Sequence, residues 1–164
     1  MRYGNVANST GSVVPLFTRQ IQEGKPITIT DPEMTRFILT LDDAAALVCT
    51  ALAEAKKGEI FVPDIPSHTI ADLAVCIKTI LKKPHHPIRI TGVRVGEKTH
   101  ETLITPTEAR RTVVKHGYFV IYPETSNIIH NKKNKMKVAR FSSDTAKKLS
   151  QDKLERLIKS AGIL

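Results

Sequence analysis

The segment MRYGNVANSTGSVVP, residues 1–15, carries the pattern that decides the fold class. A short extended run leads into Gly4-Asn5, a polar turn follows, and Gly11-Ser12 precedes an apolar helix. Such a strand-to-helix junction is typical of the interior of an α/β domain, where further strands lie beside it. The chain is therefore expected to be α/β. Because the junction stands at the start of the sequence, we expect either a small mixed sheet or a sheet of which part lies outside this chain.

The rest of the sequence alternates expected helices and strands. Helices are predicted where a Ser or Thr cap precedes a 3.6-residue apolar repeat, at 12–24, 40–57, 69–83 and from Ser150 onward. Strands are predicted at PITIT (26–30), RFILT (36–40), EIFVP (59–63) and PIRITGVRV (87–95). EIFVP has no polar face, which favours a parallel strand covered on both sides.

Two further segments have distinct patterns. EKTHETLI (97–104) predicts a short helix, and TVVKHGYFVIYP (112–123) predicts a hairpin or a bent strand around His116-Gly117. Cys49 and Cys76 both fall within helical apolar repeats, so we expect buried, reduced thiols rather than a disulfide.

Composition limits the class of protein. The chain has 164 residues, of which 41% are hydrophobic and 25% charged, as expected for a globular domain. No apolar run is long enough to cross a membrane and no secretory signal pattern is present, so a cytoplasmic location with no membrane partner is expected.

The net charge of +9 is concentrated near the C-terminal end. Residues 128–164 contain ten Lys/Arg and three Asp/Glu, whereas residues 1–127 contain fifteen and thirteen. The basic run has no aromatic residues between its charges for base stacking, so it indicates a solvated linker and not a nucleic-acid partner. We divide the chain into a main unit at 1–127, a basic linker at 128–140 and a helical segment at 141–164.

The polar residues suggest an anion site. Arg36 and Arg94 stand at the ends of predicted strands, where guanidinium groups are well placed to pair with a diphosphate. Ser12 can add backbone donors at a helix start. Glu97 can either accept hydrogen bonds from ribose hydroxyls or stabilise the first turn of the predicted helix. For either arginine taken alone, a surface ion pair is the favoured interpretation.

Other catalytic or cofactor patterns are missing from the sequence. His100-Glu101 has no second histidine at metal-ligand spacing, and no strand is followed by the glycine-rich loop that binds a dinucleotide. Tyr3 has no lysine four residues later. We therefore name no catalytic and no metal-binding residue.

Four ordered motifs resemble one family: RYGNV (2–6), GSVVPLF (11–17), PITITDPEMTRF (26–37) and GVRVGEKTHETLI (92–104). They are similar to the C-terminal half of the UDP-N-acetylglucosamine 4,6-dehydratases, which are lyases of the extended short-chain dehydrogenase/reductase superfamily. The resemblance covers residues 2–123 closely and 141–159 more loosely. It implies the C-terminal part of a Rossmann-like NAD(P)-binding fold together with its substrate-binding subdomain.

The resemblance also implies an activity in polysaccharide biosynthesis. Family members use NADP or NAD to oxidise C4 of a UDP-sugar, eliminate water across C5 and C6, and return the hydride to C6. By resemblance the UDP-sugar contacts are Asn5, Val14, Pro15, Arg36, Arg94 and Glu97. The cofactor loop and the Tyr-x-x-x-Lys pair precede RYGNV in the family, so this chain has no complete cofactor site.

Three hypotheses follow. The first is the substrate-binding part of a dehydratase, inactive alone, whose N-terminal half is encoded separately or has been lost. The expected protein partner is that N-terminal half or a second copy in a homo-oligomer. The second is a non-catalytic UDP-sugar-binding or regulatory module. The third, a nucleic-acid binder that uses the basic tail, ranks last.

Overall fold

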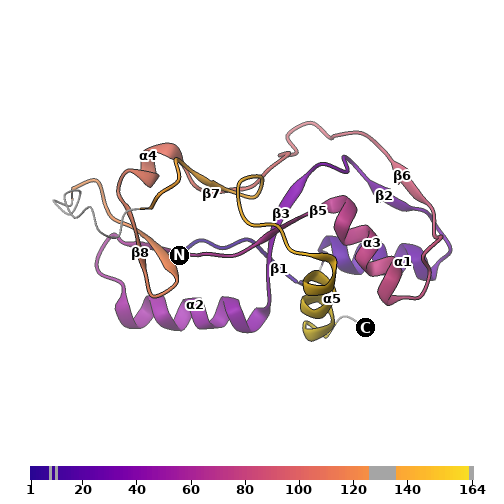
Figure 1. The fold of residues 1–164 in the computed structure, drawn as a ribbon, viewed down its shortest axis with the longest axis horizontal. Coiled ribbons are helices and arrows are strands. Elements are labelled where there is room, and N and C mark those ends of the chain that lie inside the picture. The colour runs from indigo at the N-terminus through magenta and orange to yellow at the C-terminus, as the bar shows by residue number, and fades with distance from the viewer. Residues whose placement is uncertain (8, 10, 126–135, 163–164) are drawn as a thin grey trace.

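The computed structural model describes residues 1–7, 9, 11–125 and 136–162, which form a mixed α/β structure (Figure 1). Most of the predicted basic linker, residues 128–135, lies outside the described residues. The helices are α1 (Val13–Gln22), α2 (Leu41–Glu54), α3 (Ile70–Ile80), α4 (Pro106–Ala109) and α5 (Gln151–Ser160). The strands are β1 (Asn5–Val6), β2 (Ile27–Ile29), β3 (Thr35–Leu39), β4 (Ile60–Pro63), β5 (Ser67–Thr69), β6 (Ile88–Ile90), β7 (Thr102–Ile104), β8 (Thr112–Lys115), β9 (Tyr118–Ile121) and β10 (Phe141–Ser142).

The opening segment does enter a sheet, as its pattern predicts. β1 pairs in parallel with β3, and β3 pairs antiparallel with β5. Gly4 lies so close to β3 that an added Cβ would be 2.2 Å from the Cβ of Phe37. The absence of a side chain at Gly4 is therefore what allows the first residues to lie against β3.

The EIFVP segment forms β4, but our expectation of parallel pairing was wrong. β4 pairs antiparallel with β9, which pairs in turn with β8. The other side of β4 receives a backbone hydrogen bond of 2.9 Å from the Arg2 N–H to the Phe61 carbonyl. The hairpin of β8 and β9 is as predicted, because His116 and Gly117 take the positive φ values of a tight turn.

The parallel pair β2 and β6 lies beside α1 and α3. β6 is shorter than the predicted strand, since the chain leaves β2 after Thr91, whose N–H donates to the Ile29 carbonyl at 2.8 Å. Figure 1 shows α1, α3 and α5 gathered at one end of the molecule, with α2, α4 and β8 at the other.

The helix predicted at 97–104 is absent, and β7 occupies its second half. β7 pairs antiparallel with β10 near the C-terminal end of the chain. Residues before it cannot close helical turns because their carbonyls have other donors: the Thr35 N–H bonds the Thr99 carbonyl at 3.1 Å, and Arg36 bonds Lys98 and Thr99. A long-range strand contact thus replaces local helix formation.

The two largest of three apolar clusters hold most of these elements in place. One joins α1, β2, α3 and α5 through side chains that include Phe17, Ile77 and Ile158. The other lies among β4, β7, β9 and β10 and includes Phe37 and Phe141, whose ring centroids are 5.0 Å apart. Capping boxes begin α2 and α3 as predicted, at Thr40-Asp43 and Thr69-Asp72.

The apolar repeat of α2 is buried over a narrower face than expected. Ala44 and Leu47 are buried, but Leu52 is 79% exposed. Cys49 is also exposed, so the prediction of two buried thiols was wrong for Cys49 and correct for Cys76. No disulfide joins them, and burial raises the pKa of Cys76 to about 11.

Candidate functional site

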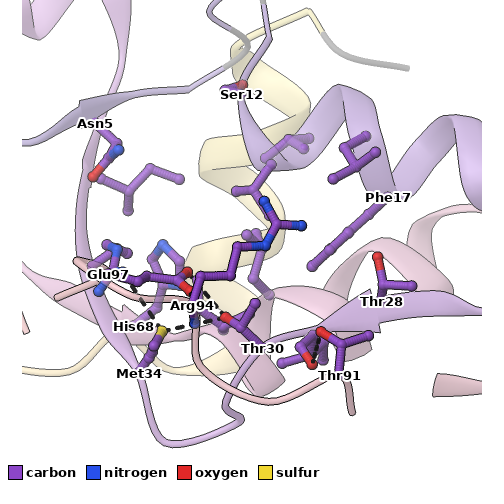
Figure 2. A pocket seen from close by; sticks show the side chains of 18 of the residues that line it. Asn5, Ser12, Phe17, Thr28, Thr30, Met34, His68, Thr91, Arg94 and Glu97 are labelled. Carbon is purple, nitrogen blue, oxygen red and sulfur yellow. Dashed lines mark hydrogen bonds between the residues drawn. The ribbon is translucent and has the colours of Figure 1, made fainter. Parts of the chain in front are cut away.

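A cavity of about 570 Å³ opens where the first turn of α1, the β1–β3–β5 sheet and the loop after β6 meet. Figure 2 shows its lining side chains, with Asn5 and His68 on one side, Phe17 and Thr28 on the other, and Arg94 between them. Cavities of this size are typical of small-molecule sites. The cavity lies on the segments that the sequence singled out.

The structure brings together five of the six residues predicted to bind a substrate. Asn5, Val14, Arg36, Arg94 and Glu97 all line the cavity. The sixth, Pro15, is not part of the lining. It stands in the first turn of α1, where proline needs no backbone donor, so its place in the fold has a local cause.

The guanidinium of Arg94 is available to a ligand. Figure 2 shows its side chain extending across the cavity toward the start of α1. Within the described part of the chain, the guanidinium has no hydrogen bond and no ion pair. The hydrogen bonds of Arg94 are made by its backbone, whose carbonyl accepts from the Glu97 N–H at 3.0 Å. An unpaired cation facing a cavity is well suited to bind an anion.

Glu97 is held in a fixed position beside Arg94. Its Oε1 accepts a hydrogen bond of 3.0 Å from the Thr30 hydroxyl, and its Oε2 accepts one of 3.3 Å from the Arg94 N–H. These bonds join the loop after β6 to the end of β2. The carboxylate retains further acceptor capacity for a ligand hydroxyl.

Arg36 is engaged differently. Its two terminal nitrogens donate to the carbonyls of Lys98 at 2.7 Å and Thr99 at 3.0 Å, and its Nε lies 3.8 Å from a Glu101 oxygen. Nη1 also donates to the Thr35 carbonyl at 2.8 Å. Most of its donors are therefore used to hold the 98–101 segment, which leaves few for the diphosphate that the sequence assigned to it.

Sequence reasoning missed Arg89 and His68. Arg89 is an exposed residue of β6 that lines the cavity, and its side chain has no ion pair with any described residue. The parallel register of β6 with Thr28 of β2 brings it there. His68 reaches the cavity because β5 pairs with β3, and neither pairing leaves a signal in the local sequence.

Part of the cavity lining is apolar, and the Ser12 hydroxyl beside it has no partner in the described structure. Val14, Phe17 and Ile29 are buried side chains that face the space. Ser12 caps α1 by its backbone conformation only, and its buried Oγ has no partner in the described structure. The site thus combines free cations, an apolar surface and the N-terminal end of a ten-residue helix.

Comparison with known proteins identifies the family. Residues 1–123 match the family model described as polysaccharide biosynthesis protein. The chain belongs to that family. This chain is 36% identical to a UDP-glucose 4-epimerase of Rickettsia akari, over 96% of the chain and 48% of the relative. It is 39% identical to a protein of Methanocaldococcus jannaschii named an uncharacterized membrane protein, over 100% of the chain and 50% of the relative.

A solved structure supports the same fold. The crystal structure of Pen from Bacillus thuringiensis matches with a TM-score of 0.86 and 32% identity, over 99% of this chain and 49% of that one. The chain thus spans about half the length of the relatives it matches. Among the residues that the structure describes, no helix is long and apolar enough to cross a membrane. The same residues contain no cluster of metal-ligating side chains.

Proposed function

We propose that this family member supplies the UDP-sugar-binding part of an NAD(P)-dependent nucleotide-sugar 4,6-dehydratase acting on UDP-N-acetylglucosamine in polysaccharide biosynthesis. The observation that carries the proposal is the guanidinium of Arg94, which has no partner among the described residues and lies in a cavity of about 570 Å³ with an apolar wall. The family match and the similarity to UDP-glucose 4-epimerases support a nucleotide sugar as the ligand.

The chemistry of the lining suits the parts of a UDP-sugar. Arg94 and Arg89 supply charge for the diphosphate, and the start of α1 adds backbone donors. The apolar wall at Val14 and Phe17 suits a planar base, while Glu97 can accept from ribose hydroxyls. Asn5 lies on the side away from Phe17, where it can reach the sugar-diphosphate.

The residues present do not fit the nicotinamide cofactor itself. The turn between β1 and α1 is the strand-to-helix junction at the cavity, and it contains one glycine, Gly11, where a dinucleotide loop needs three. We therefore assign no residue to NAD or NADP and derive no step through either. The proposed enzyme takes its cofactor site and its acid-base residues from a preceding half or from a separate chain.

A UDP-sugar 4-epimerase is the second candidate, favoured by the name of the Rickettsia relative. Both reactions oxidise C4 of the sugar, so the substrate part described here suits either. They differ in product: a dehydratase yields a 4-keto-6-deoxy sugar, and an epimerase yields the C4 epimer. A non-catalytic UDP-sugar-binding module is the remaining alternative.

Isothermal calorimetry with UDP-N-acetylglucosamine and UDP tests the binding proposal. Arg94→Ala should weaken both ligands about 10- to 100-fold, since it removes a charge-assisted pair. Arg110→Ala is the matched control, because Arg110 is exposed and lies outside the lining. Absence of binding by the unaltered chain would refute the proposal.

Activity is tested separately by mixing the chain with an expressed N-terminal half of the Methanocaldococcus relative and NAD or NADP. Formation of a 4-keto-6-deoxy sugar would support the dehydratase, and formation of the C4 epimer would support the epimerase. Binding without either product in the mixture would favour the non-catalytic module.

A further inference from the structure

His68 is a buried polar residue at the cavity that the proposed ligand contacts do not use. It is 2% exposed, although it belongs to the short strand β5 and lines the cavity. Figure 2 shows it on the same side of the cavity as Asn5. A buried polar side chain normally has a hydrogen-bond partner for each polar atom, so its bonding has to be accounted for.

The hydrogen bonds of His68 define which nitrogen is protonated. Its Nδ1 lies 2.9 Å from the Thr69 carbonyl, which can only accept, so Nδ1 carries the proton. In the neutral ring Nε2 then has a free lone pair. Nε2 has no partner among the residues that the structure describes.

The surroundings keep the ring neutral. Burial lowers the pKa of His68 and is the largest effect, and Arg36 lowers it further, while the Thr69 carbonyl and Asp72 act in the opposite direction. Arg36 lies directly opposite on β3, and Asp72 is in the first turn of α3. The other charged groups that line the cavity are Arg89, Arg94 and Glu97.

A neutral imidazole with a free Nε2 lone pair discriminates between the parts of a nucleotide sugar. A phosphate oxygen is also an acceptor, so placing it at Nε2 would bring two lone pairs together. A hydroxyl or an amide N–H would instead donate a hydrogen bond to the Nε2 lone pair. Arg94 already offers phosphate a cation elsewhere in the cavity.

We propose that His68 is a specificity-determining residue whose Nε2 accepts a hydrogen bond from a hydroxyl or amide N–H of the bound nucleotide sugar. This inference rests on the proposed function, because it names the group that the same cavity selects. In this arrangement the ligand's phosphates contact the arginines, and an uncharged hydrogen-bond donor of the ligand contacts His68 on β5. The ring stays neutral when the ligand binds.

The first test uses the unaltered chain. Calorimetry with UDP-N-acetylglucosamine at pH 7.5, in phosphate-free buffers of low and high ionisation enthalpy, measures protons taken up on binding. We expect the same heat in both buffers, because His68 remains neutral. If the parent takes up a proton on binding and His68→Gln does not, His68 becomes charged beside a phosphate. That result would overturn the proposal.

The second test uses two variants and one control. His68→Met removes the acceptor and should weaken UDP-N-acetylglucosamine about tenfold. His68→Gln restores an acceptor oxygen and should recover part of that loss. His85→Gln, which changes an exposed histidine outside the lining, should bind like the parent.

The outcomes separate the two proposals. Equal affinities of the parent and His68→Met would overturn the role of His68 and leave the proposed function intact. If His68→Met does not fold, the buffer comparison on the parent and His68→Gln still tests the role of His68. No binding by the parent would refute both the proposed function and the inference.

Discussion

Arg36 donates an Nη2–H hydrogen bond of 2.7 Å to the backbone carbonyl of Lys98. A residue of β3 thereby holds the segment that directly follows the cavity residues Arg94 and Glu97. The bond to the Thr99 carbonyl makes this a two-point contact, which suits the planar fork of arginine. Arg36 is accordingly a positioning residue for the cavity.

Replacing Arg36 with lysine should loosen the 98–101 segment, because a single ammonium group cannot span the same carbonyls. We expect amide hydrogen exchange in this segment to accelerate about tenfold, and UDP affinity to fall by a similar factor. Arg94→Ala is the matched comparison: it should lower affinity and leave exchange in 98–101 unchanged. Unchanged exchange in Arg36→Lys would contradict the positioning role.

Gly4→Ala should destabilise the protein, because the new Cβ would overlap the Cβ of Phe37 at 2.2 Å. We expect the free energy of unfolding, measured in urea, to fall by about 3 kcal/mol. Gly24→Ala is the control, since its Cβ would meet nothing within 4 Å and only its φ of 70° is unfavourable. That variant should lose about 1 kcal/mol. Equal losses would argue against close packing of the opening segment on β3.

The pair of Arg2 and Glu108 predicts a dependence of stability on pH. Two hydrogen bonds of 2.7 and 2.9 Å join them, and the bond from Arg2 is the main reason that the pKa of Glu108 falls from 4.5 to about 2. Because the folded-state pKa is depressed, the stabilisation is complete above pH 4.5 and is lost as the pH falls toward 2.

Urea unfolding at about pH 5 and about pH 3 measures this effect. The parent should lose about 1 kcal/mol more than Glu108→Gln over that interval, a value reduced for solvent screening because Arg2 is 38% exposed. Glu155→Gln removes an exposed pair with Lys159 and should follow the parent. Identical pH profiles for the parent and Glu108→Gln would refute the prediction.

The two cysteines should differ in reactivity. Cys49 is exposed on α2, whereas Cys76 is buried with its pKa raised to about 11, so it holds little thiolate at neutral pH. A chromogenic disulfide reagent should modify one thiol rapidly in the native protein and both in guanidinium. Cys49→Ser should abolish the rapid phase. Rapid reaction of both thiols in the native protein would show that α3 is less well packed than described here.

The elements that the sequence predicts correctly are those fixed by contacts between residues close together in the chain. The capping boxes at Thr40 and Thr69 bond to residues three positions later, so the sequence alone predicts where α2 and α3 begin. The hairpin turn at His116-Gly117 is local in the same sense. The predicted cavity residues were also found largely from strand ends and a family resemblance, and five of six line one space.

The failures involve contacts between distant segments. The 97–104 segment has a helical pattern, but Arg36 and Thr35 take its carbonyls and β10 pairs with its second half. Cys49 follows an apolar repeat, yet α2 presents a narrower buried face than the repeat suggests. In each case the structure of the segment depends on contacts with residues far away in the sequence, and a local sequence pattern contains no information about those contacts.

The sequence by itself determined the α/β class and the starts of α1, α2, α3 and α5, because caps, turns and apolar periods act within a few residues. Five residues that line the cavity were predicted from strand ends and from a family resemblance. Only the tertiary structure decided that β4 pairs antiparallel, that Arg36 holds a loop while Arg94 stays free, and that Arg89 and His68 reach the cavity. Strand pairing and burial join segments tens of residues apart, so their outcome depends on which partner competes best for each backbone group and each apolar surface.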